Sequence, residues 1–109
     1  MIDKLFGGKS AEAVLLFIYA FDEGYASEIS SFSGIALNVI QKQLLKFEDV
    51  GLFVSQNKGK TRMFMWNPRY YFLNEFKEFL KKVFMALPEN EMKKYYELRK
   101  RPRKGDKAL

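Results

Sequence analysis

Hydrophobic residues recur at helical spacing in the first fifth of the chain. Residues 11–21 have apolar positions three or four apart, and Ser10 directly before them predicts a capped helix. The stripe consists of Ala11, Val14, Leu15, Ile18 and Phe21. After a break, Ser27 is predicted to cap a second, short helix that ends at Gly34.

The next segment predicts a helix over residues 36–50 followed by a β-hairpin. Its buried face is formed by Ile40, Leu44 and Phe47, with Ile35 ahead of them and Val50 behind. Gly51 is a stop signal. Two apolar-rich strands, residues 52–56 and 61–66, flank a basic turn at 57–60 whose glycine suits a tight connection.

A long helix is predicted over residues 71–87, and Pro88 suits the start of a further helix. The alternating steps of three and four resemble a coiled-coil seam. Together these patterns predict an α+β, mainly α fold with a small antiparallel hairpin. The expected organisation is a domain over residues 1–70, core-completing and dimerising helices over 71–98, and a flexible basic tail over 99–109.

The charged residues are distributed unevenly along the chain. The formal charge is +6, and residues 93–109 account for all of it. Residues 36–69 carry a further local excess of basic groups, which acidic excesses in residues 1–35 and 70–92 together offset. Within the tail, the residues predicted to contact nucleic acid are Arg99, Lys100, Arg101, Arg103 and Lys104.

Composition argues against several classes of function. The chain has no cysteine and no histidine, which removes thiolate sites and the commonest metal ligand and general base. We therefore predict no catalysis, no metal and no cofactor. No apolar run approaches the roughly 20 residues of a membrane span, so a cytoplasmic protein without membrane contact is predicted.

Two helices joined by a glycine turn and followed by a hairpin form a helix-turn-helix pattern. Over about residues 5–70 the sequence resembles winged helix-turn-helix regulators of the MarR and ArsR type, including short prokaryotic stand-alone members. The matching residues are Leu5-Phe6-Gly7, Ser27-Glu28-Ile29, Gly34-Ile35, Ile40, Leu44, Phe47-Glu48, Gly51-Leu52, Lys58–Lys60, Arg62 and Asn67-Pro68.

The resemblance implies that residues 36–50 form a recognition helix in the major groove of DNA. The residues it assigns to base and phosphate contacts are Leu37, Asn38, Val39, Gln41, Lys42 and Lys46. It assigns Lys58, Gly59 and Lys60 to a wing on the backbone or in the minor groove, with Arg62 as its brace. The family commonly has Ser or Thr as the cap of this helix, where this chain has Ala36.

The excess apolar width of residues 71–87 predicts a homodimer that places two recognition helices about one DNA turn, ~34 Å, apart. The predicted interface consists of Phe72, Leu73, Phe76, Phe79, Leu80, Val83, Phe84 and Leu87. The expected function is sequence-specific binding of duplex DNA to regulate transcription. Two alternatives stay open: a protein-interaction scaffold in a replication, transcription or conjugation complex, and RNA binding. Solubility or protection of the sheet edge also accounts for exposed lysines.

Overall fold

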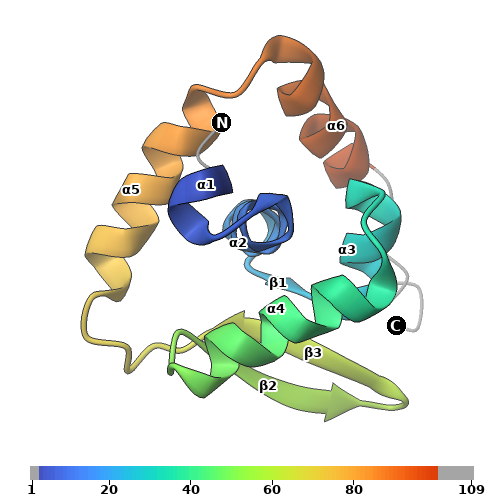
Figure 1. The fold of residues 1–109 in the computed structure, drawn as a ribbon, viewed down its shortest axis with the longest axis vertical. Helices are drawn as coiled ribbons and strands as arrows, with labels where there is room; N and C mark the ends of the chain where they lie inside the picture. Colours follow the sequence, from blue (N-terminus) through green and yellow to red (C-terminus); the bar gives the residue numbers. More distant parts are fainter. Residues whose placement is uncertain (1–2, 101–109) are drawn as a thin grey trace.

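The computed structural model describes residues 3–100, in which the other elements surround one central helix, seen end-on in Figure 1. In chain order the elements are α1 (Asp3–Phe6), α2 (Lys9–Phe21), β1 (Glu23–Gly24), α3 (Ala26–Ser33), α4 (Leu37–Asp49), β2 (Phe53–Lys58), β3 (Thr61–Trp66), α5 (Leu73–Met85) and α6 (Glu89–Lys100). The chain is mainly helical with a small antiparallel sheet, which confirms the predicted α+β, mainly α class.

The central helix, α2, buries more of its surface than the predicted stripe. Leu16 and Phe17 are buried together with the predicted Val14, Leu15 and Ile18. A helix that is hydrophobic on nearly all sides packs in the interior rather than on the surface. The surrounding helices and the sheet therefore cover α2 from several directions (Figure 1).

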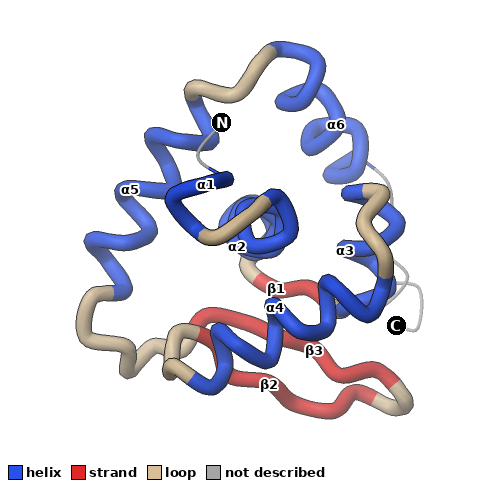
Figure 2. The backbone as a smooth tube through the Cα atoms, viewed as in Figure 1, coloured by secondary structure: helices blue, strands red, loops and turns tan. Residues whose placement is uncertain are grey.

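The sheet has the strand order β1-β3-β2, and both pairs of strands are antiparallel. It lies beneath α4 in Figure 2. The predicted hairpin is confirmed, but its loop is shorter than expected because Lys58 still pairs with Thr61. Gly59, with a φ of 65°, permits this two-residue connection. The hairpin therefore extends as a narrow ribbon to a basic tip.

Two predicted helix caps are wrong. Helix α2 begins at Lys9, after Gly8, and helix α3 begins at Ala26, after Tyr25, and neither start has a side-chain cap. Ser10 and Ser27 therefore lie inside the first turns of their helices. The predicted end of α3 at Gly34 is confirmed, because this residue is left-handed and its amide donates to the Ser30 carbonyl.

Helices α5 and α6 complete the same core as the rest of the chain. Leu80, Val83 and Phe84 of α5 are buried in it, and so is Tyr95 of α6. The Tyr95 ring packs against Phe84 and Phe32, with centroid distances of 5.0 Å and 4.8 Å. Burial, reinforced by two nearby glutamates, raises the pKa of Tyr95 above its ordinary value, so the hydroxyl stays protonated.

None of the helices within residues 3–100 has the length and apolar composition needed to cross a bilayer.

Candidate nucleic-acid interface

Helices α3 and α4 are joined by a short turn whose geometry is fixed by side-chain hydrogen bonds. The Ser30 hydroxyl donates to the Ile35 carbonyl at 2.6 Å, and the Ile35 amide donates to the Ser33 hydroxyl oxygen at 3.2 Å. Helix α4 is anchored beneath by Ile40 and Leu44, both fully buried. The predicted buried face is thus confirmed at Ile40 and Leu44, and α4 presents its opposite side outward. Ile35 and Phe47 are only partly buried, and the prediction is wrong for Val50, which is 61% exposed beyond the end of α4.

The hairpin tip lies on the same side of the molecule as the beginning of α4. In Figure 1 the tip extends below the end of α4 that follows α3. An open groove of about 510 Å³ separates the two elements. Leu37 and Gln41 of α4 line one wall, and Lys60 and Arg62 of the hairpin line the other. The structure therefore brings together residues of the predicted helix and the predicted wing.

The remaining predicted residues of α4 lie outside this groove. Asn38 and Lys42, one helical turn apart, share an exposed ridge, which neighbours the ridge of Leu37 and Gln41. Val39 and Lys46 lie seven residues apart, on the flank away from the hairpin. The Lys46 ammonium also lies 4.9 Å from the centroid of the Phe47 ring. The exposed ridges on the first half of α4 thus carry two amides and one lysine.

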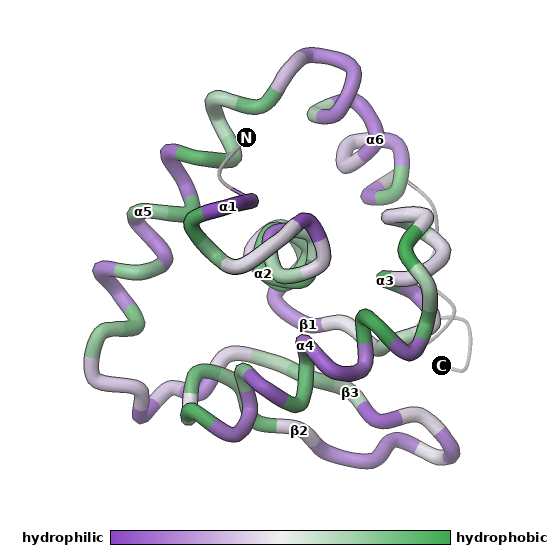
Figure 3. Tube along the Cα trace, in the orientation of Figure 1, coloured by the Kyte–Doolittle hydropathy of each residue, from purple (hydrophilic) through white to green (hydrophobic). Residues whose placement is uncertain are grey.

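Hydrophilic residues are concentrated at the outer half of the hairpin, whereas its base beside the end of α4 is hydrophobic (Figure 3). Lys58 lies 3.7 Å from the Glu23 carboxylate. Within the described part of the chain, no ion pair involves Lys42 or Lys60. Both ammonium groups are exposed.

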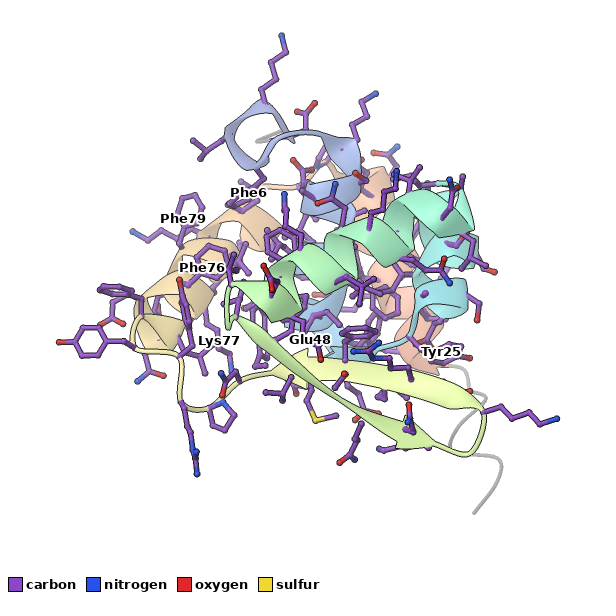
Figure 4. The ribbon with its side chains drawn as sticks, turned by 60° about the horizontal axis from the view of Figure 1, so that its bottom comes forward. Phe6, Tyr25, Glu48, Phe76, Lys77 and Phe79 are labelled. Carbon is purple, nitrogen blue, oxygen red and sulfur yellow. The ribbon has the colours of Figure 1, made fainter. Side chains whose placement is uncertain are left out.

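Arg62 has a structural partner of its own. Its Nη2 donates to Glu48 Oε1 at 2.6 Å, and its Nε donates to the Ser55 hydroxyl oxygen at 2.9 Å. The Ser55 hydroxyl in turn donates to the second Glu48 oxygen. Glu48 belongs to the last turn of α4, above the hairpin in Figure 4. This network ties the hairpin to α4, so Arg62 braces the hairpin within the protein itself.

We expect the Glu48–Arg62 pair to contribute about 0.5–1 kcal/mol to the free energy of unfolding, since half of the Arg62 side chain is exposed and solvent screens the pair. A double-mutant cycle with Glu48→Gln and Arg62→Gln, followed by urea denaturation, measures this coupling. Lys60→Gln provides the control, because Lys60 is a hairpin cation outside the network. A coupling energy of zero would contradict the bracing role.

Several predicted interface residues of α5 are wrong. Leu80, Val83 and Phe84 are buried inside the chain's own core and are inaccessible to a second subunit. Leu73, Phe76 and Leu87 are partly buried against that core. The seam-like spacing arose because a helix that closes a monomer core repeats its apolar residues at the same steps. Only Phe72 and Phe79 of the predicted set are exposed.

The predicted start of the basic tail at residue 99 is wrong, because α6 extends to Lys100. Arg99 lies in α6, where its guanidinium donates to the Ala20 carbonyl at 2.6 Å and lies 5.7 Å from the Phe21 ring centroid. It therefore stabilises the end of α2, and its assignment to a flexible arm is wrong. Lys100 is the last residue of α6. The other predicted tail contacts, Arg101, Arg103 and Lys104, lie outside the described residues.

Some residues of the groove were not predicted from the sequence. Leu45 lines it and is 47% exposed, and Tyr25 and Phe64 lie on its other sides. Figure 4 shows Tyr25 near the outer part of the hairpin. Leu45 is eight residues after Leu37 and four after Gln41, so helical spacing contained this signal. Tyr25 and Phe64 depend on tertiary packing and had no local signal.

No group of three or more acidic side chains within residues 3–100 is arranged to hold a metal ion. The candidate surface consists of an exposed helix and a hairpin that line an open groove. Comparison with known proteins found no family model that matches this chain and no significant match among curated proteins.

Proposed function

We propose that this protein binds duplex DNA as a winged helix-turn-helix regulator, with α4 in the major groove and the hairpin tip on the adjacent backbone. The observation that carries the proposal is the shared orientation of α4 and the hairpin, which line opposite walls of one groove. A helix fits the width of the major groove, and a projecting loop beside it then meets the neighbouring phosphates.

The side chains on these elements suit different parts of a duplex. The amides of Asn38 and Gln41 can each pair with the edge of an adenine, whereas Lys42 and Lys60 suit phosphate oxygens. All four side chains are exposed. Base contacts would then supply sequence preference and the lysines most of the affinity, and occupancy of an operator would regulate transcription.

The contacts that hold α4 and the hairpin in place support separate roles for base-contacting and phosphate-contacting side chains. The hydrogen-bonded turn before α4 and the Glu48–Ser55–Arg62 network at its other end hold the helix relative to the hairpin. A fixed relation between a groove-reading helix and a backbone-binding loop reduces the conformational entropy lost on binding. No cofactor is required for this function.

A second candidate, protein docking, is favoured by one observation. Leu37 and Leu45 are 43% and 47% exposed on the wall of the groove, and Tyr25 and Phe64 also line it. An apolar groove with a basic rim suits an acidic amphipathic segment of another protein. Under this alternative, Leu37→Ala with Leu45→Ala would abolish partner binding, and duplex affinity would be low and independent of sequence.

The sheet gives less support to an RNA-binding function. The aromatic side chains on the three strands are Phe53, Phe64 and Trp66, and all of them are buried. Modules that stack RNA bases on a sheet need exposed aromatic rings there. Competition with single-stranded RNA in the binding assay below addresses this alternative.

Selection from a random duplex library, followed by titration of the selected duplex over a salt series, tests the proposal. We expect an enriched sequence, tighter binding to it than to scrambled duplex, and affinity that falls as salt rises because counterions are released. Weak binding that is equal for every duplex would contradict sequence-specific regulation. Preferential displacement by single-stranded RNA would favour the RNA-binding alternative.

A further inference from the structure

One flank of α5 remains uncovered and carries a regular pattern. Phe72 and Phe79 are 56% and 40% exposed, and Ala86 is exposed beyond them. Phe79 lies within α5, and Phe72 and Ala86 directly precede and follow the helix. The three residues are seven positions apart, so they follow one line along the helix and its two ends. Glu75 and Lys82, both exposed, lie beside this line, also seven positions apart. The flank therefore combines an apolar line with an acidic residue near its beginning and a basic residue near its end.

Helix α1 extends this apolar surface. The Phe6 ring lies 6.1 Å from both Phe76 and Phe79, measured between centroids, and Figure 4 shows the three rings gathered between α1 and α5. Leu5 beside them is 70% exposed. A contiguous group of exposed apolar side chains is characteristic of an interaction surface.

We propose that this flank binds the same flank of a second copy of the chain, with the two α5 helices antiparallel. A two-fold axis near Phe79 places it beside the partner's Phe79. Positions 72 and 86 are equidistant from 79, so the large Phe72 meets the partner's Ala86. Positions 75 and 82 are nearly equidistant from 79, so Glu75 lies beside the partner's Lys82. The two-fold symmetry repeats this contact, which gives two pairs of opposite charges.

The order of Glu75 and Lys82 along α5 favours the antiparallel arrangement of the two helices. In a parallel pair, Glu75 would face the partner's Glu75 and Lys82 would face the partner's Lys82, and like charges oppose association. In the antiparallel pair both positions meet the opposite charge. A symmetric interface must be complementary to itself, and this flank meets that requirement in both size and charge.

The antiparallel dimer changes the geometry of DNA binding, a consequence that rests on the proposed function. Helix α4 and the hairpin lie at the end of the molecule where α5 begins (Figure 1). A two-fold axis perpendicular to α5 reverses its direction, so the two copies of α4 lie toward opposite ends of the dimer. Such a dimer holds two duplex segments apart rather than two half-sites one turn apart on one duplex.

Sedimentation of charge-swapped variants tests the dimer without DNA. We expect the wild type to dimerise at micromolar concentration, and Glu75→Lys or Lys82→Glu alone to weaken the dimer about tenfold. The double variant, Glu75→Lys with Lys82→Glu, should return to near wild-type affinity. Lys81→Glu, on the opposite side of α5, is the matched control and should have no effect. A monomeric wild type, or a double variant weaker than each single one, would overturn the proposal.

Cysteine cross-linking tests the direction, because the chain has no native cysteine. The double variant Glu75→Cys with Lys82→Cys should form a disulfide-linked dimer under mild oxidation, whereas Glu75→Cys alone should not. Efficient cross-linking of the single variant would indicate a parallel pair and overturn the antiparallel one. Circular dichroism verifies that each variant is folded.

Two differently labelled duplexes test the consequence for DNA. The wild-type dimer should bring both labels into one complex, and a dimer that binds only one duplex through both subunits would overturn the bridging geometry. A dimer that binds no duplex at all would instead contradict the proposed function and leave the interface intact. The two failures are therefore distinguishable.

Discussion

Replacement of both Lys42 and Lys60 by glutamate is expected to lower the affinity for duplex DNA by about 100-fold or more at 0.1 M salt. Both lysines are exposed, and neither is in an ion pair within the described residues. Reversal of two charges that face phosphates replaces attraction by repulsion at two contacts. Fluorescence anisotropy with a labelled duplex measures the change.

The neutral variant, Lys42→Gln with Lys60→Gln, separates phosphate contacts from general electrostatics. Loss of two phosphate contacts should reduce the slope of log affinity against log salt by about 1.8, because each contact contributes about 0.9. Lys93→Gln with Lys94→Gln removes the same charge from α6, which lies across the molecule from α4 in Figure 1. If the α6 variant changes the slope as much as the α4–hairpin variant, the proposed interface is wrong.

Gly24→Ala is expected to reduce the free energy of unfolding by about 2 kcal/mol through overpacking. A Cβ atom at this position would lie 2.9 Å from two ring carbons of Phe17 and 3.2 Å from the Ile18 side chain. Phe17 is fully buried, with its ring 4.7 Å from Phe21 and 5.4 Å from Phe32 between centroids, so it has little room to move. Urea denaturation followed by circular dichroism measures the loss.

A second substitution identifies the cause of that loss. Phe17→Leu leaves space beside Gly24, so Gly24→Ala should cost less in the Phe17→Leu background than in the wild type. Equal costs in both backgrounds would show that the contact with Phe17 is not responsible. Wild-type stability of Gly24→Ala itself would contradict the close packing of β1 on α2.

The elements that position the candidate interface were predictable because their signals are local. Ile40, Leu44 and Gly51 define α4 and its end within a few turns of chain, and Gly59 with its flanking strands defines the hairpin. These features depend on helical periodicity and turn chemistry, which a sequence contains directly. Their shared orientation depends on contacts between α4 and the hairpin, such as the Glu48–Arg62 pair, and no local pattern contained it.

Contacts between residues far apart in the sequence could not be predicted from local patterns. Arg62 pairs with Glu48 across 14 positions, and Arg99 reaches Ala20 across 79. Arg99 had been assigned to a nucleic-acid arm and Arg62 to the brace of a DNA-binding wing, because a charge in a sequence does not indicate its folded partner. The structure gives both arginines partners within the protein.

Helix periodicity alone also left the role of α5 ambiguous. The spacing of Leu80 and Val83 is equally typical of a subunit interface and of a monomer core, and burial decides for the core. The same structure leaves Phe72 and Phe79 uncovered. The interface prediction therefore moves from the centre of the apolar stripe to its edge.

NMR titration of the isotopically labelled protein with the selected duplex maps the contacted surface residue by residue, and so tests whether α4 and the hairpin bind DNA. We expect the largest amide shift changes in residues 37–42 and 58–61. Changes confined to α1, α5 or α6, with α4 and the hairpin unaffected, would contradict it.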